Sequence, residues 1–240
     1  KTVLAEEITV KVIARIHTDF PEKFGIPRQS GLIEELKSTI VFEPEFRDAN
    51  ALRGLEEYSH LWLIWEFSQA IRKEWSPTVR PPKLGGNTRV GVFATRSPFR
   101  PNPIGLSSVQ LTGVTLNPQD GPVIHIQGAD LLDGTPIYDI KPYIPYADSH
   151  PEARGSFATA HRDDHLQVQF PPELLNKVPQ QKQKPLIQIL ALDPRPAYQQ
   201  DPERIYGFPF AGLEIKFRVE EETLYVCEVN KEERKQWKKS

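Results

Sequence analysis

The sequence contains one cysteine and no methionine. A lone cysteine, Cys227, cannot form a disulfide within the chain, and it excludes a cysteine-rich metal site. The spacing of His161 and His165 is conceivable for metal ligands, but a solvated loop is favoured, so we expect no metal. The lone cysteine fits a reducing compartment such as the cytoplasm. Because an initiator methionine is missing too, we expect that Lys1 is not the native start of the protein.

Long hydrophobic runs are also missing. The most apolar segment, residues 61–67, contains Glu66 and is far too short to cross a bilayer. The first residues, KTVLAEEITVKV, lack the apolar region of a secretory signal. Together these absences predict a cytoplasmic protein that does not enter a membrane.

An excess of one charge is missing as well. The 30 Lys and Arg residues face 32 Asp and Glu residues, which gives a formal net charge of −2. No overall positive field marks the chain as a nucleic-acid binder, so any RNA site must be a local basic patch. The motifs GxGxxG, GxxxxGK(S/T) and GxSxG are absent, so the sequence does not support a Rossmann, P-loop or α/β-hydrolase site.

Short strand-like segments make up the first part of the chain. Apolar residues alternate with polar ones, or β-branched and aromatic residues cluster, in residues 8–16, 38–44, 60–68, 89–97, 107–116 and 122–132. Residues 48–58 predict one short helix. Strands of this length, separated by Pro/Gly loops and with no β-α-β alternation, predict a mainly β fold with a closed β-barrel.

The composition changes after residues 142–157. A polar, proline-rich stretch leads to a short helical segment near residues 185–192, and residues 212–229 alternate like a hairpin. We place a domain boundary between residues 146 and 155. The prediction is an N-terminal barrel domain of residues 1–150 and a smaller α+β domain of residues 151–240.

The most unusual segment is GVFATRSPFRPNPIGLS, residues 91–107. It fixes Arg96 and Arg100 on a loop that Pro98, Pro101 and Pro103 restrict to few conformations. Guanidinium groups on a stiff loop suit a carboxylate or a phosphate. The alternative is a rigid turn whose arginines pair with nearby acids.

Three further segments each allow two interpretations. FGIPRQSG, residues 24–31, presents Arg28 and Gln29, and is either a binding loop or an exposed turn. His60 begins an apolar strand, and is either a reactive group or a hydrogen-bonded structural residue. DLLDGTPIYDIKPY, residues 130–143, contains the turn Asp-Gly-Thr-Pro, and is either a simple turn or a source of carboxylate, hydroxyl and exposed backbone groups for a ribose or an amine.

Together these segments resemble the TsaA-like family, also called the TrmO or YaeB type. The matching stretches are EKFGIPRQSGL, ALRGLEEYSHLWLIWEF, PTVRPPKLGGNTRVGVFATRSPFRPNPIGLS and LLDGTPIYDIKPYIPYADS, and DPRPAY at residues 193–198 matches the longer bacterial members. The resemblance implies a β-barrel that binds S-adenosylmethionine without a Rossmann sheet. It implies an enzyme that methylates N6 of threonylcarbamoyladenosine, just 3′ of the anticodon in certain tRNAs. It also implies a homodimer with the cofactor near the subunit interface.

The resemblance also implies the cofactor-binding residues. By motif they are Pro27, Arg28, Gln29, His60, Leu61, Arg96, Leu106, Asp133, Gly134, Thr135 and Pro136. Arginine suits the carboxylate of the cofactor, the Asp133 turn suits its amine or hydroxyls, and we expect Leu61 and Leu106 to enclose the adenine. A base for the N6 proton is expected among His60, Asp133 and Tyr143, which the sequence does not distinguish.

Five residues are candidates for RNA contact: Arg80, Lys83, Arg89, Arg195 and Tyr198. The basic residues can pair with phosphates, and Tyr198 can stack on a base. In the alternative interpretation they only hold the two domains together, with Asp193 neutralising Arg195.

Two other functions compete with methyl transfer. The first is a non-catalytic RNA-binding β-barrel, whose arginine loops hold phosphates and whose RNA binding depends strongly on salt. The second is a small-molecule hydrolase, which we rank last because the sequence offers no credible pair of nucleophile and base.

Overall fold

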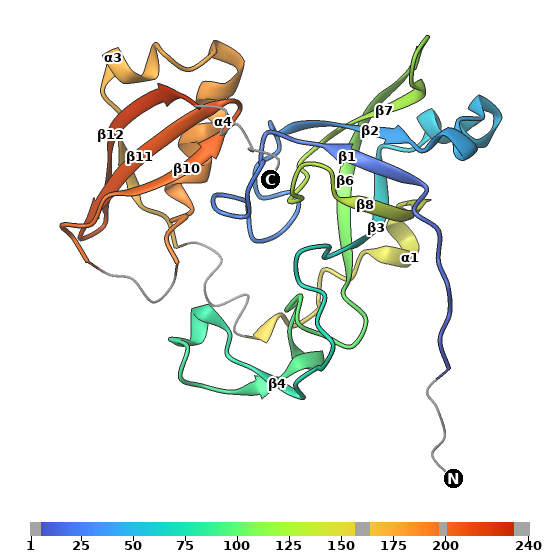
Figure 1. The fold of residues 1–240 in the computed structure, drawn as a ribbon, viewed down its shortest axis with the longest axis horizontal. Helices are drawn as coiled ribbons and strands as arrows, with labels where there is room; N and C mark the ends of the chain where they lie inside the picture. Colours follow the sequence, from blue (N-terminus) through green and yellow to red (C-terminus); the bar gives the residue numbers. More distant parts are fainter. Residues whose placement is uncertain (1–5, 157–163, 197–200, 233–240) are drawn as a thin grey trace, which may run out of the picture.

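A computed structural model of the chain describes residues 6–156, 164–196 and 201–232. The strands form two separate assemblies, an N-terminal one and a C-terminal one, which lie next to each other (Figure 1). A search of these residues for a helix with the length and hydropathy needed to span a bilayer found none.

Six N-terminal strands pair in a closed ring. In ring order they are β1 (Ala14–His17), β2 (Lys37–Phe42), β7 (Gly121–Gln127), β6 (Ile104–Asn117), β3 (His60–Glu66) and β8 (Pro136–Pro142). Every neighbouring pair is antiparallel, and the ring closes where Ala14 of β1 lies opposite Ile137 of β8. The mainly β prediction is confirmed.

The core of the ring follows from strand alternation. In β3 the side chains of Leu61, Leu63 and Trp65 are buried, while the residues between them are half-buried on the outer side. Equivalent inward positions on the other strands complete one apolar cluster, which includes Ile16, Ile40, Val109, Leu111, Ile124, Ile126 and Ile137. This burial stabilises the ring at roughly 25 cal/mol per Å² of apolar surface.

Several predicted N-terminal elements differ in the structure, and the strand expected over residues 122–132 ends at Gln127 as β7. The strand expected over residues 8–16 is limited to β1, because Ile8 and Val10 lie 83% and 54% exposed, outside any strand. The helix expected over residues 48–58 is a pair of 3₁₀ turns, η2 (Ala49–Leu52) and η3 (Leu55–Glu57), because Gly54 between them has a φ of +85°. The strand expected over residues 89–97 is the two-residue β5 (Val90–Gly91), followed by η5 (Val92–Ala94).

The connection from β3 to β6 forms a separate lobe beside the ring, marked by β4 in Figure 1. It holds the short ribbon of β4 (Thr78–Val79) with β5, and the 3₁₀ turn η4 (Pro82–Leu84). Trp75 and Phe93 pack ring to ring within it, with centroids 6.1 Å apart. Two other short turns lie elsewhere in the N-terminal half, η1 (Pro44–Phe46) and α1 (Pro145–Asp148).

The C-terminal assembly is a four-stranded sheet with helices. The strand order is β10 (Tyr206–Phe210), β11 (Leu213–Glu220), β12 (Thr223–Lys231) and β9 (Gln167–Gln169), with β9 parallel to β12 and the other pairs antiparallel. Beside the sheet lie α3 (Pro172–Leu175) and α4 (Gln180–Ala191) (Figure 1). The hairpin predicted over residues 212–229 is confirmed as β11 and β12.

Helix α4 begins at Gln180, five residues before the predicted start at residue 185. Pro185 therefore lies inside the helix and not at its start. Leu186, Ile189 and Leu190 of α4 are buried in the core against the sheet. Three residues from the segment after β1 share that core: Phe20, Ile33 and Leu36. The segment itself, residues 18–36, lies between the two assemblies (Figure 1).

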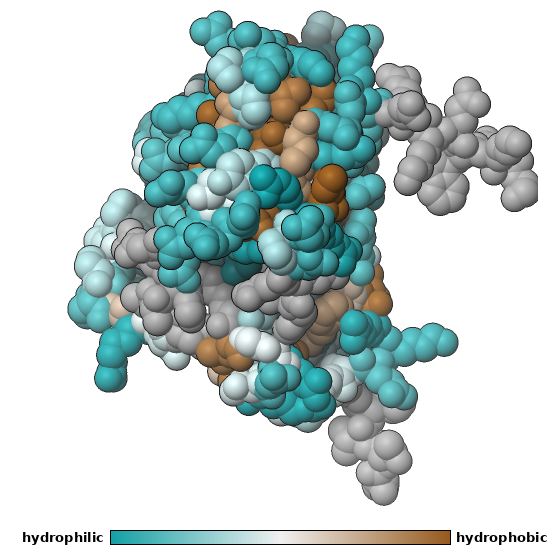
Figure 2. Space-filling view, turned by 90° about the vertical axis from the view of Figure 1, so that its left-hand side faces the viewer, coloured by the Kyte–Doolittle hydropathy of each residue, from teal (hydrophilic) through white to brown (hydrophobic). Residues whose placement is uncertain are grey.

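The outward face of the C-terminal assembly is mainly hydrophilic. Figure 2 shows a mostly hydrophilic surface, with apolar side chains visible between polar ones in the upper part of the view.

Candidate functional site

A chain of buried polar contacts links three parts of the ring. The indole Nε1 of Trp65 donates to Ser107 Oγ at 3.0 Å, and Ser107 Oγ donates to Asp130 Oδ1 at 2.7 Å. Trp65 lies on β3, Ser107 lies on β6, and Asp130 follows β7. Opposite Trp65 the chain has Gly105, where an added Cβ would overlap the indole ring. The sequence therefore needs glycine at this position for the indole to reach Ser107.

The Asp130 carboxyl has an unusual environment. Burial raises its pKa above the ordinary value, and the hydrogen bond from Ser107, backbone N–H groups including that of Ser30, and the charge of Arg96 oppose this shift. A carboxylate enclosed in this way needs nearby positive groups to remain ionised. Asp130 opens the predicted segment 130–143, but the sequence does not single it out as a site residue; it lies three residues after the end of the buried strand β7.

Arg96 and Gln29 bring two predicted loops together. Arg96 Nη1 donates a hydrogen bond to Gln29 Oε1. Arg96, Arg28 and Gln29 are all exposed, whereas Pro27 is buried. The carboxylate of Asp130 lies near Arg96, so loop 27–31, loop 95–100 and the segment after β7 meet at one place.

Arg100 has a different role from Arg96. Its Nη1 donates to the backbone carbonyls of Thr95 and Ser97, both at 3.1 Å. The Ser97 N–H in turn donates to Thr95 Oγ1 at 3.2 Å. Arg100 therefore holds the loop, and Arg96 is the guanidinium that the loop presents.

His60 lies at the edge of a polar cavity of about 230 Å³. Its lining residues are Ser30, Gly31, Glu34, His60, Ser108, Gln110, Gln127 and Gly128. His60 Nδ1 shares a 2.8 Å hydrogen bond with Ser59 Oγ, and the Tyr143 ring lies 6.1 Å from the imidazole ring. His60 and Tyr143 are thus neighbours, and the cavity joins His60 to the loop that carries Gln29.

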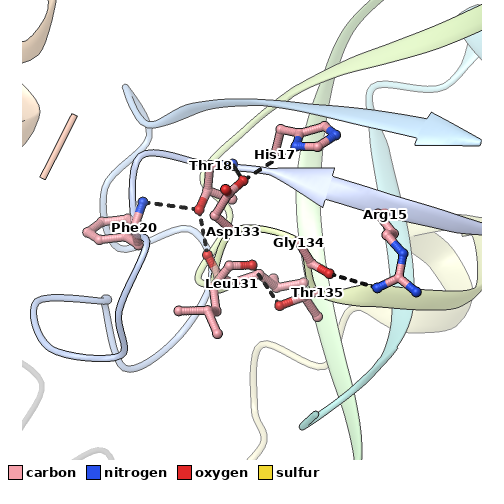
Figure 3. Close-up of polar contacts among 9 residues, drawn as sticks. Arg15, His17, Thr18, Phe20, Leu131, Asp133, Gly134 and Thr135 are labelled. Atoms are coloured by element: carbon pink, nitrogen blue, oxygen red, sulfur yellow. Dashed lines mark hydrogen bonds and ion pairs between the residues drawn. The ribbon is translucent and has the colours of Figure 1, made fainter. Parts of the chain in front are cut away.

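The DGTP turn packs against the end of β1 (Figure 3). Asp133 Oδ1 accepts a hydrogen bond from the Thr18 N–H at 3.0 Å, and His17 Nδ1 lies 3.5 Å from the same oxygen. The Gly134 carbonyl accepts from Arg15 Nη1 at 3.2 Å. The turn therefore fixes the start of segment 18–36, and Asp133, still 44% exposed in its side chain, already has protein partners.

The remaining residues of this turn are mainly structural. Thr135 is buried, and its hydroxyl donates to the Leu132 carbonyl at 2.6 Å. Pro136 is buried as the first residue of β8. Gly134 has a φ of +78°, a conformation that strongly favours glycine.

Leu61 and Leu106 lie on opposite faces of their strands. Leu61 is 0% exposed inside the ring, whereas Leu106 is 55% exposed outside it, opposite Ile64. The prediction that both side chains enclose one adenine is therefore wrong within a single chain. Strand alternation separates them, because Leu61 faces inward and Leu106 faces outward.

Family models match two parts of the chain: the tRNA-methyltransferase O N-terminal domain at residues 15–149, and the TrmO C-terminal domain at residues 163–232. The chain belongs to the tRNA-methyltransferase O family. The resemblance inferred from the four sequence segments is confirmed.

Relatives of this tRNA-methyltransferase O family member align over most of their length. The tRNA (adenine(37)-N6)-methyltransferase of Escherichia coli is 41% identical over 215 residues, 86% of this chain and 91% of the relative. A putative S-adenosylmethionine-dependent methyltransferase, RcsF, of Pseudomonas aeruginosa is also 41% identical, over 86% of this chain and 90% of its own. A crystal structure of TrmO from P. aeruginosa superposes with a TM-score of 0.77 at 34% identity, covering 97% of this chain and 100% of that one.

The RNA candidates of this family member fall in two places. Arg80 and Arg89 are exposed near the β4–β5 ribbon, and Arg89 Nη1 donates to Thr78 Oγ1 at 2.9 Å. Arg195 is 13% exposed in its side chain and binds Asp193 through Nε and Nη2, both at 2.8 Å, as the alternative interpretation expected. The Lys83 side chain and Tyr198 lie outside the described part of the chain.

The described residues include no group of three or more His, Cys, Asp or Glu side chains that could hold a metal ion.

The candidate site offers five polar groups. They are the exposed guanidiniums of Arg28 and Arg96, the amide of Gln29, the imidazole of His60 and the shielded carboxylate of Asp130. They suit a ligand with both a carboxylate and a cationic or hydroxyl-bearing part.

Proposed function

We propose that the chain is an S-adenosylmethionine-dependent tRNA methyltransferase that transfers a methyl group to N6 of adenine 37, the reaction in the name of its E. coli relative. The name of the P. aeruginosa relative supports the donor. The observation that carries the proposal is the convergence of Gln29, Arg96 and Asp130 from three distant segments. The acceptor in this proposal is threonylcarbamoyladenosine, which the sequence motifs imply.

The chemistry of the site fits this donor. Arg28 and Arg96 match a carboxylate, and the backbone and side-chain oxygens of the site match an ammonium group and ribose hydroxyls. We assign the cofactor to Pro27, Arg28, Gln29, His60, Arg96 and the turn 133–136, in which Asp133 presents the exposed side chain and Gly134, Thr135 and Pro136 set the shape of the backbone. Leu61 contributes its backbone and Leu106 its exposed side chain. When bound, S-adenosylmethionine supplies a methyl group on a positively charged sulfur.

The residues of the chain then position the acceptor and take up its proton. Alignment of the acceptor nitrogen with the methyl group supplies much of the rate enhancement in a displacement of this kind. We assign the base to His60, because it lines the cavity next to the Gln29 loop and its Nδ1 is oriented by Ser59. Tyr143 is the second candidate, and Asp133 is less suited because Thr18 and His17 already occupy its carboxylate.

The architecture in this proposal is that of the family. The ring of strands acts as a closed β-barrel domain over residues 1–150, and residues 151–240 form an α+β domain that helps to bind tRNA in the cytoplasm. The working form is a homodimer. Ile104 and Leu106 are exposed apolar residues on the outer side of β6. Their exposure supports a dimer in which a second copy of the chain covers this surface.

A methyl-transfer assay tests the proposal. Purified protein is incubated with methyl-labelled S-adenosylmethionine and tRNA that either carries or lacks the threonylcarbamoyl group. We expect label only in the modified tRNA. Equal label in both tRNAs would reject the acceptor, and RNA binding without any label would support the non-catalytic RNA-binding alternative.

A further inference from the structure

We propose that the C-terminal assembly holds the cofactor loop, residues 24–31, in its binding conformation, with Phe24 and Phe208 as the positioning residues. This inference rests on the proposed function, which assigns Arg28 and Gln29 of that loop to the cofactor. It gives the C-terminal assembly a role in the cofactor site in addition to any contact with RNA.

Aromatic packing joins the loop to the C-terminal sheet. The ring of Phe24 lies edge-on to Phe208 of β10, with centroids 5.8 Å apart, and is stacked 6.5 Å from Phe217 of β11. Gly25, with a φ of +91°, lies so close that an added Cβ would be 2.5 Å from Phe208 Cδ2. The loop backbone therefore rests directly on the Phe208 ring, three residues before Arg28.

Polar contacts fix both ends of segment 18–36, which contains the cofactor loop. On α4, Lys182 forms an ion pair with Asp19 and Lys184 forms one with Glu35. The Ala211 N–H, just after β10, donates to the Asp19 carbonyl at 3.1 Å. The Asp19–Lys182 pair is mostly buried, with the two side chains 20% and 23% exposed, so solvent screens it less than a surface pair.

The ring supports a different part of the loop. The Gly31 N–H donates to the Gly128 carbonyl at 2.9 Å, and Arg96 binds Gln29. These ring contacts begin at residue 29, whereas Phe20, Phe24 and Ile26 pack on the C-terminal core. Without that core three apolar side chains would face water, and the loop would populate its binding conformation less often.

The consequence for binding is quantitative. The apparent dissociation constant rises in inverse proportion to the fraction of molecules whose loop is in the binding conformation. A variant that frees the loop without altering Arg28, Gln29 or Arg96 therefore weakens cofactor binding. A variant that only destabilises the C-terminal core does not.

The test compares Phe24→Ala with Leu224→Ala in the full chain. Leu224 is fully buried in the same core but lies on β12, opposite Val168 of β9. Calorimetric titration with S-adenosylmethionine, below the melting temperature of both variants, should give a Kd about tenfold weaker for Phe24→Ala. Leu224→Ala should lower Tm and leave Kd within about twofold of the wild type. Amide hydrogen exchange over residues 25–31, measured without ligand, should quicken only in Phe24→Ala.

A charge exchange provides the rescue. Asp19→Lys and Lys182→Asp should each weaken S-adenosylmethionine binding and quicken exchange in the loop, and the double variant should restore both. Wild-type cofactor binding in Phe24→Ala with unchanged loop exchange would overturn this inference alone. A wild-type chain that takes up no cofactor would overturn the proposed function, and with it the role assigned to the loop.

Discussion

Ser107 donates a hydrogen bond to Asp130 across 2.7 Å, and this contact joins β6 to the segment that follows β7. The same hydroxyl accepts the indole N–H of Trp65, so its one O–H donor and one of its two acceptor lone pairs serve a single network. Asp130 in turn faces Arg96 and the Ser30 N–H. The network thus connects the interior of the ring to the loops that carry Arg96 and Ser30.

Removing the Ser107 hydroxyl should destabilise the fold. In Ser107→Ala, the Trp65 N–H loses its acceptor and Asp130 loses a donor. Because both groups are enclosed, we expect urea denaturation to show a free energy of unfolding lower by about 1–3 kcal/mol. Ser108→Ala, next in the chain but facing the cavity, should change it by less than about 0.5 kcal/mol. Equal losses in the two variants would contradict the assigned network.

Asp130 should make stability fall as pH rises. Its folded pKa is raised above the ordinary value of 3.8, so the native state binds its proton more tightly than the unfolded state. Its stabilising contribution is complete below pH 3.8 and is lost as pH rises through the higher folded pKa. Asp130→Asn removes this dependence. The free energy of unfolding of the wild type minus that of Asp130→Asn should therefore decrease with pH across this window, and an increase would show that the pKa is lowered instead.

Gly105 should not tolerate a side chain. In Gly105→Ala the new methyl group meets the Trp65 indole, which cannot shift without leaving Ser107. We expect a loss of about 1–3 kcal/mol in the free energy of unfolding. The control is Gly91→Ala, where a Cβ would meet no other atom within 4 Å. A loss of the same size in Gly91→Ala would indicate a general cost of replacing glycine.

Local pattern was enough to predict most strands. The dense aromatic and apolar run of β3 and the alternation of the β11–β12 hairpin are both visible in the sequence. The pairing of β8 with both β1 and β3 was not predictable, because these strands are far apart in the chain. The same limit applies to residues 8–12, where alternation is present in the sequence but the chain does not join the ring before β1.

The candidate site was predictable only in part. The motifs identified Arg96 and Gln29, but not the hydrogen bond between them. Asp130 and Asp133 are three residues apart and look equivalent in the sequence. Tertiary contacts separate them, since Asp130 is enclosed beside Arg96 whereas Asp133 holds the end of β1. Likewise, the inward direction of the Leu61 side chain becomes clear only once the strands are paired in the ring.

His60 should affect turnover more than cofactor affinity. In its proposed role as the base, His60 would take up the N6 proton during the reaction, so His60→Gln should lower kcat by about 100-fold. Its Kd for S-adenosylmethionine, measured by calorimetry, should change much less. Tyr143→Phe keeps the ring beside His60 and should retain kcat within about threefold. The reverse ranking of the two variants would assign the base to Tyr143.

Arg96 is the residue on which the proposed site for the methyl donor depends most directly. Calorimetric titration of S-adenosylmethionine into the wild type, Arg96→Ala and Arg89→Ala tests this claim without requiring turnover. We expect Arg96→Ala to bind about 10- to 100-fold more weakly, as loss of a charged hydrogen bond implies, and Arg89→Ala to bind like the wild type. Equal affinity in all three proteins, or no binding by the wild type, would contradict the assignment of this site.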